Sequence, residues 1–366
     1  MRSLAVEWLG VRSFRNLTST DIALGRGLNV FAGDNGQGKT SFLEAVYVLA
    51  TSRSFRATKP GDVVQIGAET ASVRGGVRED GELREQSVGL RRGQRFVRMD
   101  GKPPPSLADY AIRTPIVAFH PAALVLSAGG GTERRKLLDR VAFHRSPASL
   151  AESAAYSKAM RARQRLLETR GERSPGLEEW EELVVRHGLA VSDGREGAVG
   201  AIGSSAEEAF RRIGSEDLSL RASYQRSAPS EAAAYRAALE ENRSKDRARG
   251  SATIGPHRDD LLLELSGRPV RGVASQGQHR TVVLALELAE MDVIARLRAV
   301  RPILLLDDVS SELDRQRTSA LLTVLGQETG QVLLTTTRPE LIGAAGARGT
   351  EPRRDFVVVR GEIRPT

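Results

Sequence analysis

The sequence predicts an α/β fold that is built from both ends of the chain, with a mainly helical lobe inserted between them. A glycine-rich loop, Gly33–Thr40, follows a short apolar strand near the start. A second apolar strand, Ile303–Leu306, ends in two carboxylates near the other end. These residue types share one phosphate site in many nucleotide-binding proteins, so we expect the two ends to form a single core.

The first 120 residues have the pattern of strands around one helix. Leu4–Leu9 alternates as a strand does, and Leu28–Ala32 is an apolar strand that leads into the loop. Thr40–Ala50 has apolar residues at helical spacing, which gives the strand, loop and helix order that the loop motif requires. A helix is predicted at Leu107–Ile112, and the further predicted strands are Val63–Ile66, Ala71–Val77, Gln86–Leu90, Arg95–Met99 and Pro115–Phe119.

The middle of the chain is typical of helices. One helix is predicted from Thr132, and two more at Ser149–Arg170 and Leu177–Ile213 are separated by a glycine and proline break, which indicates an antiparallel hairpin. No heptad pattern is sustained, so no long coiled coil is expected. The remaining predictions are strands at Leu218–Tyr224, Asp260–Leu265, Gln331–Thr335 and Phe356–Val359, helices at Glu231–Glu241, His279–Val300 and Arg315–Leu325, and a charged linker at Asn242–Gly250.

Composition narrows the class of protein. The 366 residues are 40% hydrophobic and 27% charged, which fits a globular protein. The chain has no cysteine, no apolar run of the roughly 18–20 residues that cross a bilayer, and no signal-peptide pattern at its start, so we expect a cytoplasmic protein without membrane partners. The net charge of +8 favours a polyanionic partner such as nucleic acid, although a basic surface without a partner remains the alternative.

The loop matches G-x-x-x-x-G-K-[ST] at every fixed position. Its backbone N–H groups and the following helix N-terminus would surround phosphates, Lys39 would neutralise the β- and γ-phosphates, and the Thr40 hydroxyl would bind Mg²⁺. A glycine-rich turn that happens to contain lysine is the alternative. The expected nucleotide-binding residues here are Gly33, Asp34, Asn35, Gly36, Gln37, Gly38, Lys39, Thr40 and Ser41.

The acidic pair follows Lys39 by 268 positions. Asp307 would hold Mg²⁺ through water, and Asp308 would act with Lys39 in catalysis, as a general base on the attacking water. Because aspartate reaches less far than glutamate, slow hydrolysis is expected. A strand that ends in a solvated acidic turn is the alternative.

Two further polar segments are candidates for binding phosphate. In Ser275-Gln276-Gly277-Gln278, before a long helix, Ser275, Gly277 and Gln278 would bind the γ-phosphate of a second protomer across a symmetric interface, unless this is an ordinary turn. In Gly255–Asp260, His257 and Arg258 would contact phosphate or a partner, unless this is a turn with Asp259 and Asp260 solvated. The segment Val309–Asp314 would lie at the seam of a dimer or simply cap a helix.

The order of these motifs resembles that of ABC-type ATPase heads in chromosome-maintenance and break-repair proteins, and the whole chain resembles the RecF family of bacterial recombination mediators. Besides the segments already named, the resemblance rests on Phe14–Leu17, Arg53–Arg56, Arg134–Asp139 and Ser311–Asp314. The chain departs from the ABC pattern at Ala274 and Gln276, where leucine and glycine are usual, and at Thr335-Thr336-Thr337, which lacks a histidine for the γ-phosphate.

The resemblance implies an ABC-type ATPase domain at 1–120 plus 255–366 and an inserted, mainly helical arm at 121–254. It implies that ATP with Mg²⁺ drives formation of a homodimer that clamps DNA at single-strand gaps or junctions, and that weak ATP hydrolysis releases it. It implies work with RecO and RecR to promote RecA loading at single-strand gaps, and a cytoplasmic protein associated with the nucleoid. Whether the protein is best described as an enzyme stays open, since the ATPase would act as a switch.

Two other functions fit a phosphate loop. An ATPase subunit of a transporter would have a shorter gap between the two nucleotide motifs and no excess of arginine. A small-molecule kinase would need a substrate lid and would have no use for the turn at Ser275–Gln278.

Overall fold

The computed structural model describes residues 1–214, 217–308, 330–342 and 353–366. The chain folds into two compact units. The core unit comprises Met1–Ala123, Ala209–Ser215 and Gln276–Thr366, and the helical unit comprises Leu124–Glu208 and Glu216–Ser275. The boundaries differ from those expected, because the segment from Gly255 to Ser275 belongs to the helical unit and the last turn of a long helix belongs to the core unit.

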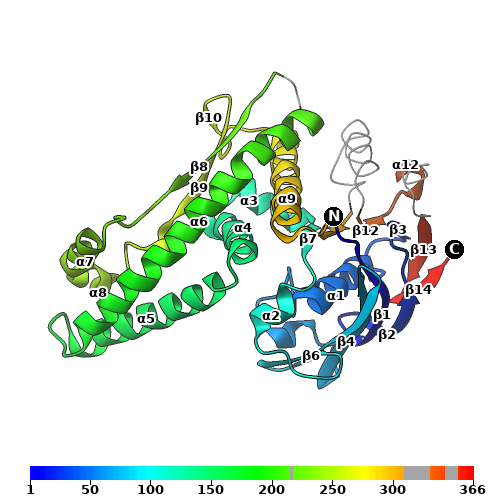
Figure 1. The fold of residues 1–366 in the computed structure, drawn as a ribbon, viewed down its shortest axis with the longest axis horizontal. Helices are drawn as coiled ribbons and strands as arrows, with labels where there is room; N and C mark the ends of the chain where they lie inside the picture. Colours follow the sequence, from blue (N-terminus) through cyan, green and yellow to red (C-terminus); the bar gives the residue numbers. More distant parts are fainter. Residues whose placement is uncertain (215–216, 309–329, 343–352) are drawn as a thin grey trace. The chain divides into compact units, whose positions relative to one another are not determined.

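A six-stranded sheet in the core unit interleaves strands from both chain ends (Figure 1). Its order is β14 (Glu362–Pro365), β13 (Arg354–Val359), β3 (Leu28–Ala32), β12 (Val332–Thr336), β11 (Ile303–Leu306) and β7 (Ile116–Phe119). All neighbours are parallel except β13 and β14. The carboxyl ends of β3 and β11 therefore meet at the same edge of the sheet, as the sequence predicted.

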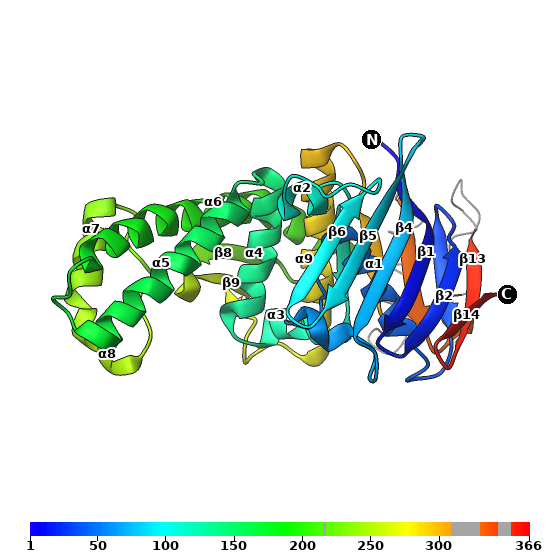
Figure 2. The same ribbon diagram turned by 90° about the horizontal axis from the view of Figure 1, so that it is seen from below.

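A second sheet in the core unit is antiparallel throughout (Figure 2). Its order is β2 (Leu17–Ala23), β1 (Leu4–Phe14), β4 (Thr70–Glu79), β5 (Glu82–Arg91) and β6 (Gln94–Met99). The turns at Asp80-Gly81 and Arg92-Gly93 join β4 to β5 and β5 to β6, and Gly81 and Gly93 have φ of 88° and 72°. Glycine accepts that left-handed backbone without strain, so tight turns can form at both places.

The helix α1 (Lys39–Thr51) is packed between these two sheets, and ten of its thirteen residues are buried. A helix that is apolar on most of its circumference is suited to such a place. The ring of Phe31 in β3 stacks on that of Phe356, with centroids 4.8 Å apart, and packs at a tilt against that of Phe42, 4.6 Å away. The end of β3 and the start of α1 are therefore fixed by packing on both sides of the loop that joins them.

A buried glutamine ties the two sheets of the core unit together. The Gln331 amide donates to the carbonyls of Val6 and Gly25 at 2.7 Å each, and its oxygen accepts from the N–H of Val6 at 2.8 Å. Among the described residues of this unit, the other helical elements are η1 (Pro60–Val63), α2 (Leu107–Ala111), η2 (Pro121–Leu124, whose last residue belongs to the helical unit), α9 (Gln276–Arg298) and α12 (Pro339–Ile342).

The helical unit is built on a pair of long helices. The predicted hairpin of α5 (Ser149–Arg170) and α6 (Leu177–Ile213) is confirmed. An ion pair from Arg163 to Glu181 and a hydrogen bond between Glu152 and His187 show that the two helices are antiparallel. The other elements are α3 (Val125–Ala128), α4 (Gly131–Arg145), β8 (Leu220–Gln225), α7 (Ala232–Glu241), α8 (Arg243–Arg249), η3 (Pro256–Arg258), β9 (Asp260–Leu265) and β10 (Arg268–Pro269), and the three strands form one sheet.

A buried ionic network lies at the centre of the helical unit. The guanidinium of Arg163 donates to Glu181 at 3.0 Å, to Asp246 at 2.7 Å and to the carbonyl of Leu239 at 2.9 Å, and all three charged groups are excluded from water. Asp246 belongs to α8, so the prediction of a linker at Asn242–Gly250 was wrong. Asp246 and Arg243 of this segment pair with Arg163 and Glu181 of the long helices, and a local pattern of charges does not reveal such distant partners.

Two other predictions, a strand at Val63–Ile66 and a helix at Arg315–Leu325, have different outcomes. Val63–Ile66 is not a strand, because Pro60 opens a 3₁₀ turn that ends at Val63. The predicted helix Arg315–Leu325 lies outside the described residues. Of the helices that the structure describes, none is long and apolar enough to cross a membrane.

The network around Arg163 leads to a prediction on stability. Arg163→Met should lower the free energy of unfolding by about 3–5 kcal/mol, because it leaves Glu181 and Asp246 buried with less compensation. The matched control is Arg236→Met, which breaks an exposed ion pair with Glu182 and should cost less than about 1 kcal/mol. Urea denaturation followed by circular dichroism measures both, and equal losses would contradict the prediction.

Candidate functional site

The loop Gly33–Thr40 joins β3 to α1 and is shaped by its glycines. Gly36 and Gly38 have φ of 80° and 112°. A β-carbon on Gly33 would lie 2.3 Å from the carbonyl oxygen of Val358 in β13, which no rearrangement of a side chain could relieve. The loop therefore needs glycine both for its turn and for its close approach to the neighbouring strand.

Lys39 points back into the loop. Its ammonium donates to the carbonyl oxygens of Gly33 at 2.7 Å and Asp34 at 2.9 Å. Burial lowers the pKa of Lys39, while the carboxylates of Asp308, Asp307 and Asp34 oppose that shift. A buried cation is thus held at the centre of the loop, where an anionic ligand would be attracted to it.

Asp307 joins the two predicted halves of the site. Its carboxylate accepts hydrogen bonds from the hydroxyl of Thr40, at 2.9 Å to each oxygen, across 267 positions of sequence. It also accepts one from Thr335 at 2.8 Å. Burial raises the pKa of Asp307, while the hydroxyls of Thr335 and Thr40 act in the opposite direction. A bound cation would favour the ionised carboxylate further.

Asp308 has an unusual backbone. Its φ is 51°, in the left-handed region that non-glycine residues seldom adopt, and its N–H donates to the Thr335 hydroxyl at 2.8 Å. Thr335 therefore holds both acids of the pair, one through its donor and one through its acceptor. The prediction that the acidic turn lies beside the loop is right, and the alternative of a solvated turn fails for Asp307, which is buried.

The two oxygen donors suit a magnesium ion that takes its other ligands from phosphate and water. Mg²⁺ is commonly held by only one or two protein groups together with substrate oxygens, and the Thr40 hydroxyl and the Asp307 carboxylate are of that kind. Within the described residues, no group of three or more His, Cys, Asp or Glu could hold a metal by itself. These residues therefore fit a metal that comes with a nucleotide.

The remaining loop residues differ in exposure. Asp34 and Asn35 are exposed, whereas Ser41 is buried on α1. Gln37 contacts the turn between β13 and β14, where its side-chain oxygen accepts from the N–H of Arg360 at 2.5 Å and its carbonyl from the N–H of Gly361 at 2.8 Å. The carbonyl of Gly36 accepts a hydrogen bond from the Asn16 side chain at 3.1 Å.

Sequence reasoning missed a buried acid beside the loop. Glu44 of α1 is fully buried and accepts from both Nε and Nη2 of Arg15, at 3.0 and 2.8 Å, and from the Ser54 hydroxyl at 2.5 Å. Arg56 lies 3.7 Å from Glu44, and its charge also acts to lower the pKa of Asp307. The sequence does show an acidic residue inside a mostly apolar helix, which indicates a buried carboxylate. It does not show which residues bind Glu44, because they lie elsewhere in the chain.

The predicted residues for a second protomer lie at the start of α9. Ser275 and Gln276 are exposed, and the Gly277 carbonyl accepts from the Thr281 hydroxyl at 2.9 Å. The contacts that unite Lys39, Thr40 and Asp307 do not include Ser275, Gly277 or Gln278. The segment Val309–Asp314 lies outside the described residues.

The two aspartates of the cluster Gly255–Asp260 are bound by partners inside the helical unit. Asp259 is fully buried and accepts hydrogen bonds from Ser192 at 2.7 Å, from Tyr224, and from the N–H of Ser227 at 2.7 Å. Asp260 accepts two hydrogen bonds of 2.7 Å from Arg134. The turn reading with both aspartates in water was therefore wrong.

His257 of the same cluster is bound within the helical unit, by the hydroxyl of Tyr156 at 2.7 Å and the carbonyl of Ala252 at 3.0 Å. Burial lowers the pKa of His257. This favours a structural role for His257 rather than contact with phosphate.

Comparison with known proteins shows the family of the chain. The family model described as "RecF/RecN/SMC N terminal domain" matches residues 5–349. The DNA replication and repair protein RecF of Geobacter sp. strain M21 is 37% identical over 336 residues, 90% of this chain and 92% of the relative. That of Myxococcus xanthus is 36% identical and covers 100% of this chain and 99% of its own length. A solved structure of the recombination mediator RecF with ATP, in the RecFOR pathway, is 26% identical over the whole of both chains, with a TM-score of 0.87.

The fold is accordingly that of an SMC-like, ABC-type ATPase head, with the phosphate loop and the acidic strand end in the order that the sequence predicted. These matches extend over nearly the whole chain and include both ends and the insertion. The chain belongs to the RecF family of DNA replication and repair proteins.

Proposed function

We propose that this protein is an ATP-controlled DNA-binding protein of recombinational repair, in which ATP joins two protomers and hydrolysis separates them. The observation that carries the proposal is the contact of Thr40 with Asp307, because it assembles a phosphate loop and an acidic strand end into one site. Membership of the RecF family, and the ATP-bound RecF structure to which the chain is similar, support the choice of ATP.

In the proposed bound state, the backbone N–H groups of the loop and the start of α1 surround the phosphates. Lys39 gives up its two carbonyl partners and donates to phosphate oxygens, which are stronger acceptors for an ammonium group. Thr40 and Asp307 would hold Mg²⁺, which supplies charge neutralisation at the phosphates when it is bound. The remaining loop residues position the nucleotide through their backbone.

Asp308 is proposed as the general base. It accepts a proton from water as the water oxygen attacks the γ-phosphorus, and the bond to the bridging oxygen breaks to give ADP and phosphate. Thr335 fixes the backbone of Asp308 and the side chain of Asp307 together. Because the carboxylate of aspartate is short and Thr336 and Thr337 offer no imidazole, turnover should be slow, which suits a switch.

The second protomer is proposed to complete the site. Ser275 is exposed just before α9, and Gly277 and Gln278 lie half-buried in its first turn. The N-terminus of this helix of 23 residues can bind a phosphate of the partner's nucleotide. Two such contacts in a symmetric dimer enclose two ATP molecules. The core unit is then the ATPase domain and the helical unit the arm, and the basic chain would hold DNA at gaps and act with RecO and RecR to promote RecA loading.

Replacing Lys39 by Arg should separate binding from turnover. The charge is kept, so ATP affinity should change by less than about threefold, but the longer planar group misplaces that charge and should slow hydrolysis at least about tenfold. Lys59→Arg, at an exposed lysine, is the control and should change neither value. Nucleotide-binding fluorescence and phosphate release measure the two; unchanged turnover in the Lys39 variant would contradict the assigned role.

Ser275→Arg should prevent ATP-dependent dimerisation and leave ATP binding nearly intact, because the residue serves the partner's nucleotide and not its own. Sedimentation velocity with and without ATP measures the effect. Ser157→Arg, at an exposed serine of α5, is the matched control and should dimerise like the unaltered protein. A protein that stays monomeric with ATP at micromolar concentration would refute the dimer itself.

DNA affinity should fall steeply with salt, since the proposed grip rests on arginine contacts to phosphate. With about six phosphate contacts, the loss between about 50 and about 200 mM salt is on the order of a thousandfold. Fluorescence anisotropy of a labelled gapped duplex, in the presence of ATP, measures it. A flat response to salt would rule out binding through phosphates.

A further inference from the structure

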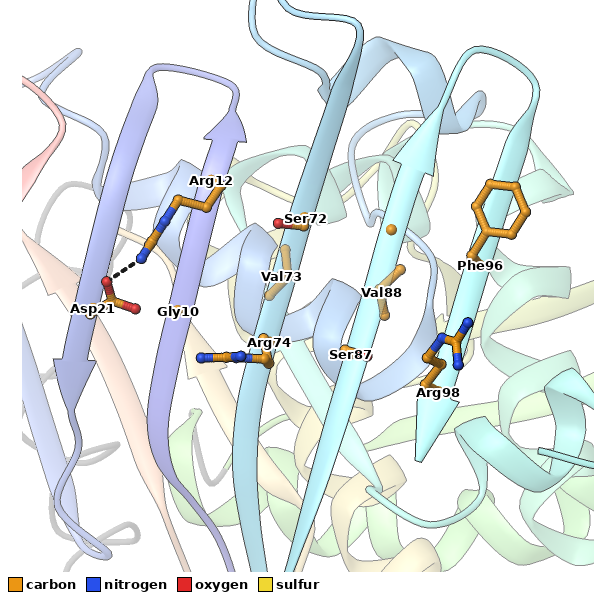
Figure 3. A pocket seen from close by; sticks show the side chains of 11 residues that line it. Gly10, Arg12, Asp21, Ser72, Val73, Arg74, Ser87, Val88, Phe96 and Arg98 are labelled. Carbon is orange, nitrogen blue, oxygen red and sulfur yellow. Dashed lines mark hydrogen bonds and ion pairs between the residues drawn. The ribbon is translucent and has the colours of Figure 1, made fainter. Parts of the chain in front are cut away.

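The outer face of the five-stranded sheet carries a hollow that the nucleotide site does not use. This face consists of the side chains of β1, β2, β4, β5 and β6 that point away from α1 (Figure 3). The hollow has a volume of about 440 Å³ and is open to solvent. It lies wholly within the core unit.

Strand register places the lining residues in rows across the sheet. One row runs Arg98, Ser87, Arg74, Gly10 and Asp21 from β6 to β2. Because neighbouring strands are about 4.8 Å apart, the α-carbons of Arg98 and Arg74 lie about 10 Å apart, with Ser87 between them. Basic groups are thus spaced across the face with small residues between them.

The second row, one pleat further along, contains Phe96, Gly89, Ser72 and Arg12. Gly89 forms the bottom of the hollow in this row, and packing does not require so small a residue there. A β-carbon on Gly89 would meet only Phe96, at 3.8 Å, which is ordinary van der Waals contact. Glycine inside a strand costs stability, and one common reason for it is the close approach of a ligand.

Charge on this face is positive. The hollow is lined by three arginines and one carboxylate. Arg12 pairs with Asp21, but both side chains are about half exposed or more, at 49% and 62%, so that pair is weak and can be exchanged for a phosphate. Arg74 lies over the ring of Trp8, 5.5 Å from its centroid, and Arg98 donates to the carbonyl of Gly101 at 2.9 Å. These contacts hold the guanidinium groups at the surface.

Phe96 is the residue that selects the kind of ligand. It stands on the edge strand β6 with 59% of its surface exposed, beside Arg98 and next to the shallow floor (Figure 3). A duplex would offer phosphates to the arginines but no free base to the phenyl ring. An unpaired base can stack on it, and arginines beside an exposed aromatic ring are the pattern of single-strand binding surfaces.

We propose that the outer sheet face binds single-stranded DNA, with phosphates on Arg98, Arg74 and Arg12 and one base stacked on Phe96. This proposal rests on the proposed function, for which it names the strand that the core unit contacts at a gap. An acidic segment of a protein partner could pair with the same arginines, but it would have no base to stack on the ring of Phe96.

The test is the affinity of the full chain for a labelled oligothymidylate, measured by fluorescence anisotropy. Phe96→Leu keeps an apolar side chain but removes the ring, and should weaken binding about tenfold, while Phe96→Tyr should bind like the unaltered protein. Arg74→Gln with Arg98→Gln should reduce the slope of log affinity against log salt by about 0.7 for each lost contact. Arg236→Gln, an exposed arginine of the helical unit, is the control and should leave the slope unchanged.

Two outcomes would overturn the proposal. Either the Phe96→Leu and arginine variants bind the single strand as well as the unaltered protein does, or a polyglutamate competes as well as the oligonucleotide and is equally sensitive to Phe96. ATP-dependent sedimentation of the same variants separates the two hypotheses. Single-strand binding that requires Phe96, in a protein that never dimerises with ATP, would refute the proposed function and leave this inference standing.

Discussion

The contact between the Thr40 hydroxyl and the Asp307 carboxylate is the constraint on which the rest of the core unit depends. A buried carboxylate is costly unless it is hydrogen-bonded, and Asp307 meets that cost with Thr40 and Thr335. Thr40 stands in the first turn of α1, which both sheets enclose. Any shift of β11 would therefore disturb the position of the loop, and any shift of the loop would disturb the position of the acidic pair.

Sequence patterns correctly predicted those elements whose formation depends on residues close together in the chain. The strand β3, its loop and α1 follow from glycine spacing and apolar periodicity, and β9 was predicted with its observed ends. Errors arose where charges have distant partners. Asp246 meets Arg163 across 83 positions and Asp260 meets Arg134 across 126. A sequence shows only that these residues are polar. A linker was therefore predicted wrongly at Asn242–Gly250, and a solvated turn stayed open as an alternative at Gly255–Asp260 that the structure excludes.

The same distinction applies to the site. Lys39, Thr40 and Asp307 were predicted because a motif fixes their chemistry, and the structure brings them together. The roles of Glu44 and Thr335 were missed, because the residues next to them in sequence do not reveal their partners. Glu44 binds Arg15 and Ser54, and Thr335 binds Asp307 and Asp308. The roles of Ser275 and Gly277 stay predictions, because they concern a second protomer, which a single chain does not contain.

The place of β3 in its sheet has a consequence for synthesis. Its two neighbours, β12 and β13, come about 300 residues later in the chain. While the ribosome makes the intervening residues, β3 has neither partner, and the turn that contacts Gln37 has not yet been made. Pairing over such separations is slow and leaves apolar strands exposed. The helical unit, whose residues lie within about 150 positions of one another, can fold first, so a nascent chain would carry a finished helical unit before its phosphate loop and its acidic strand end can meet.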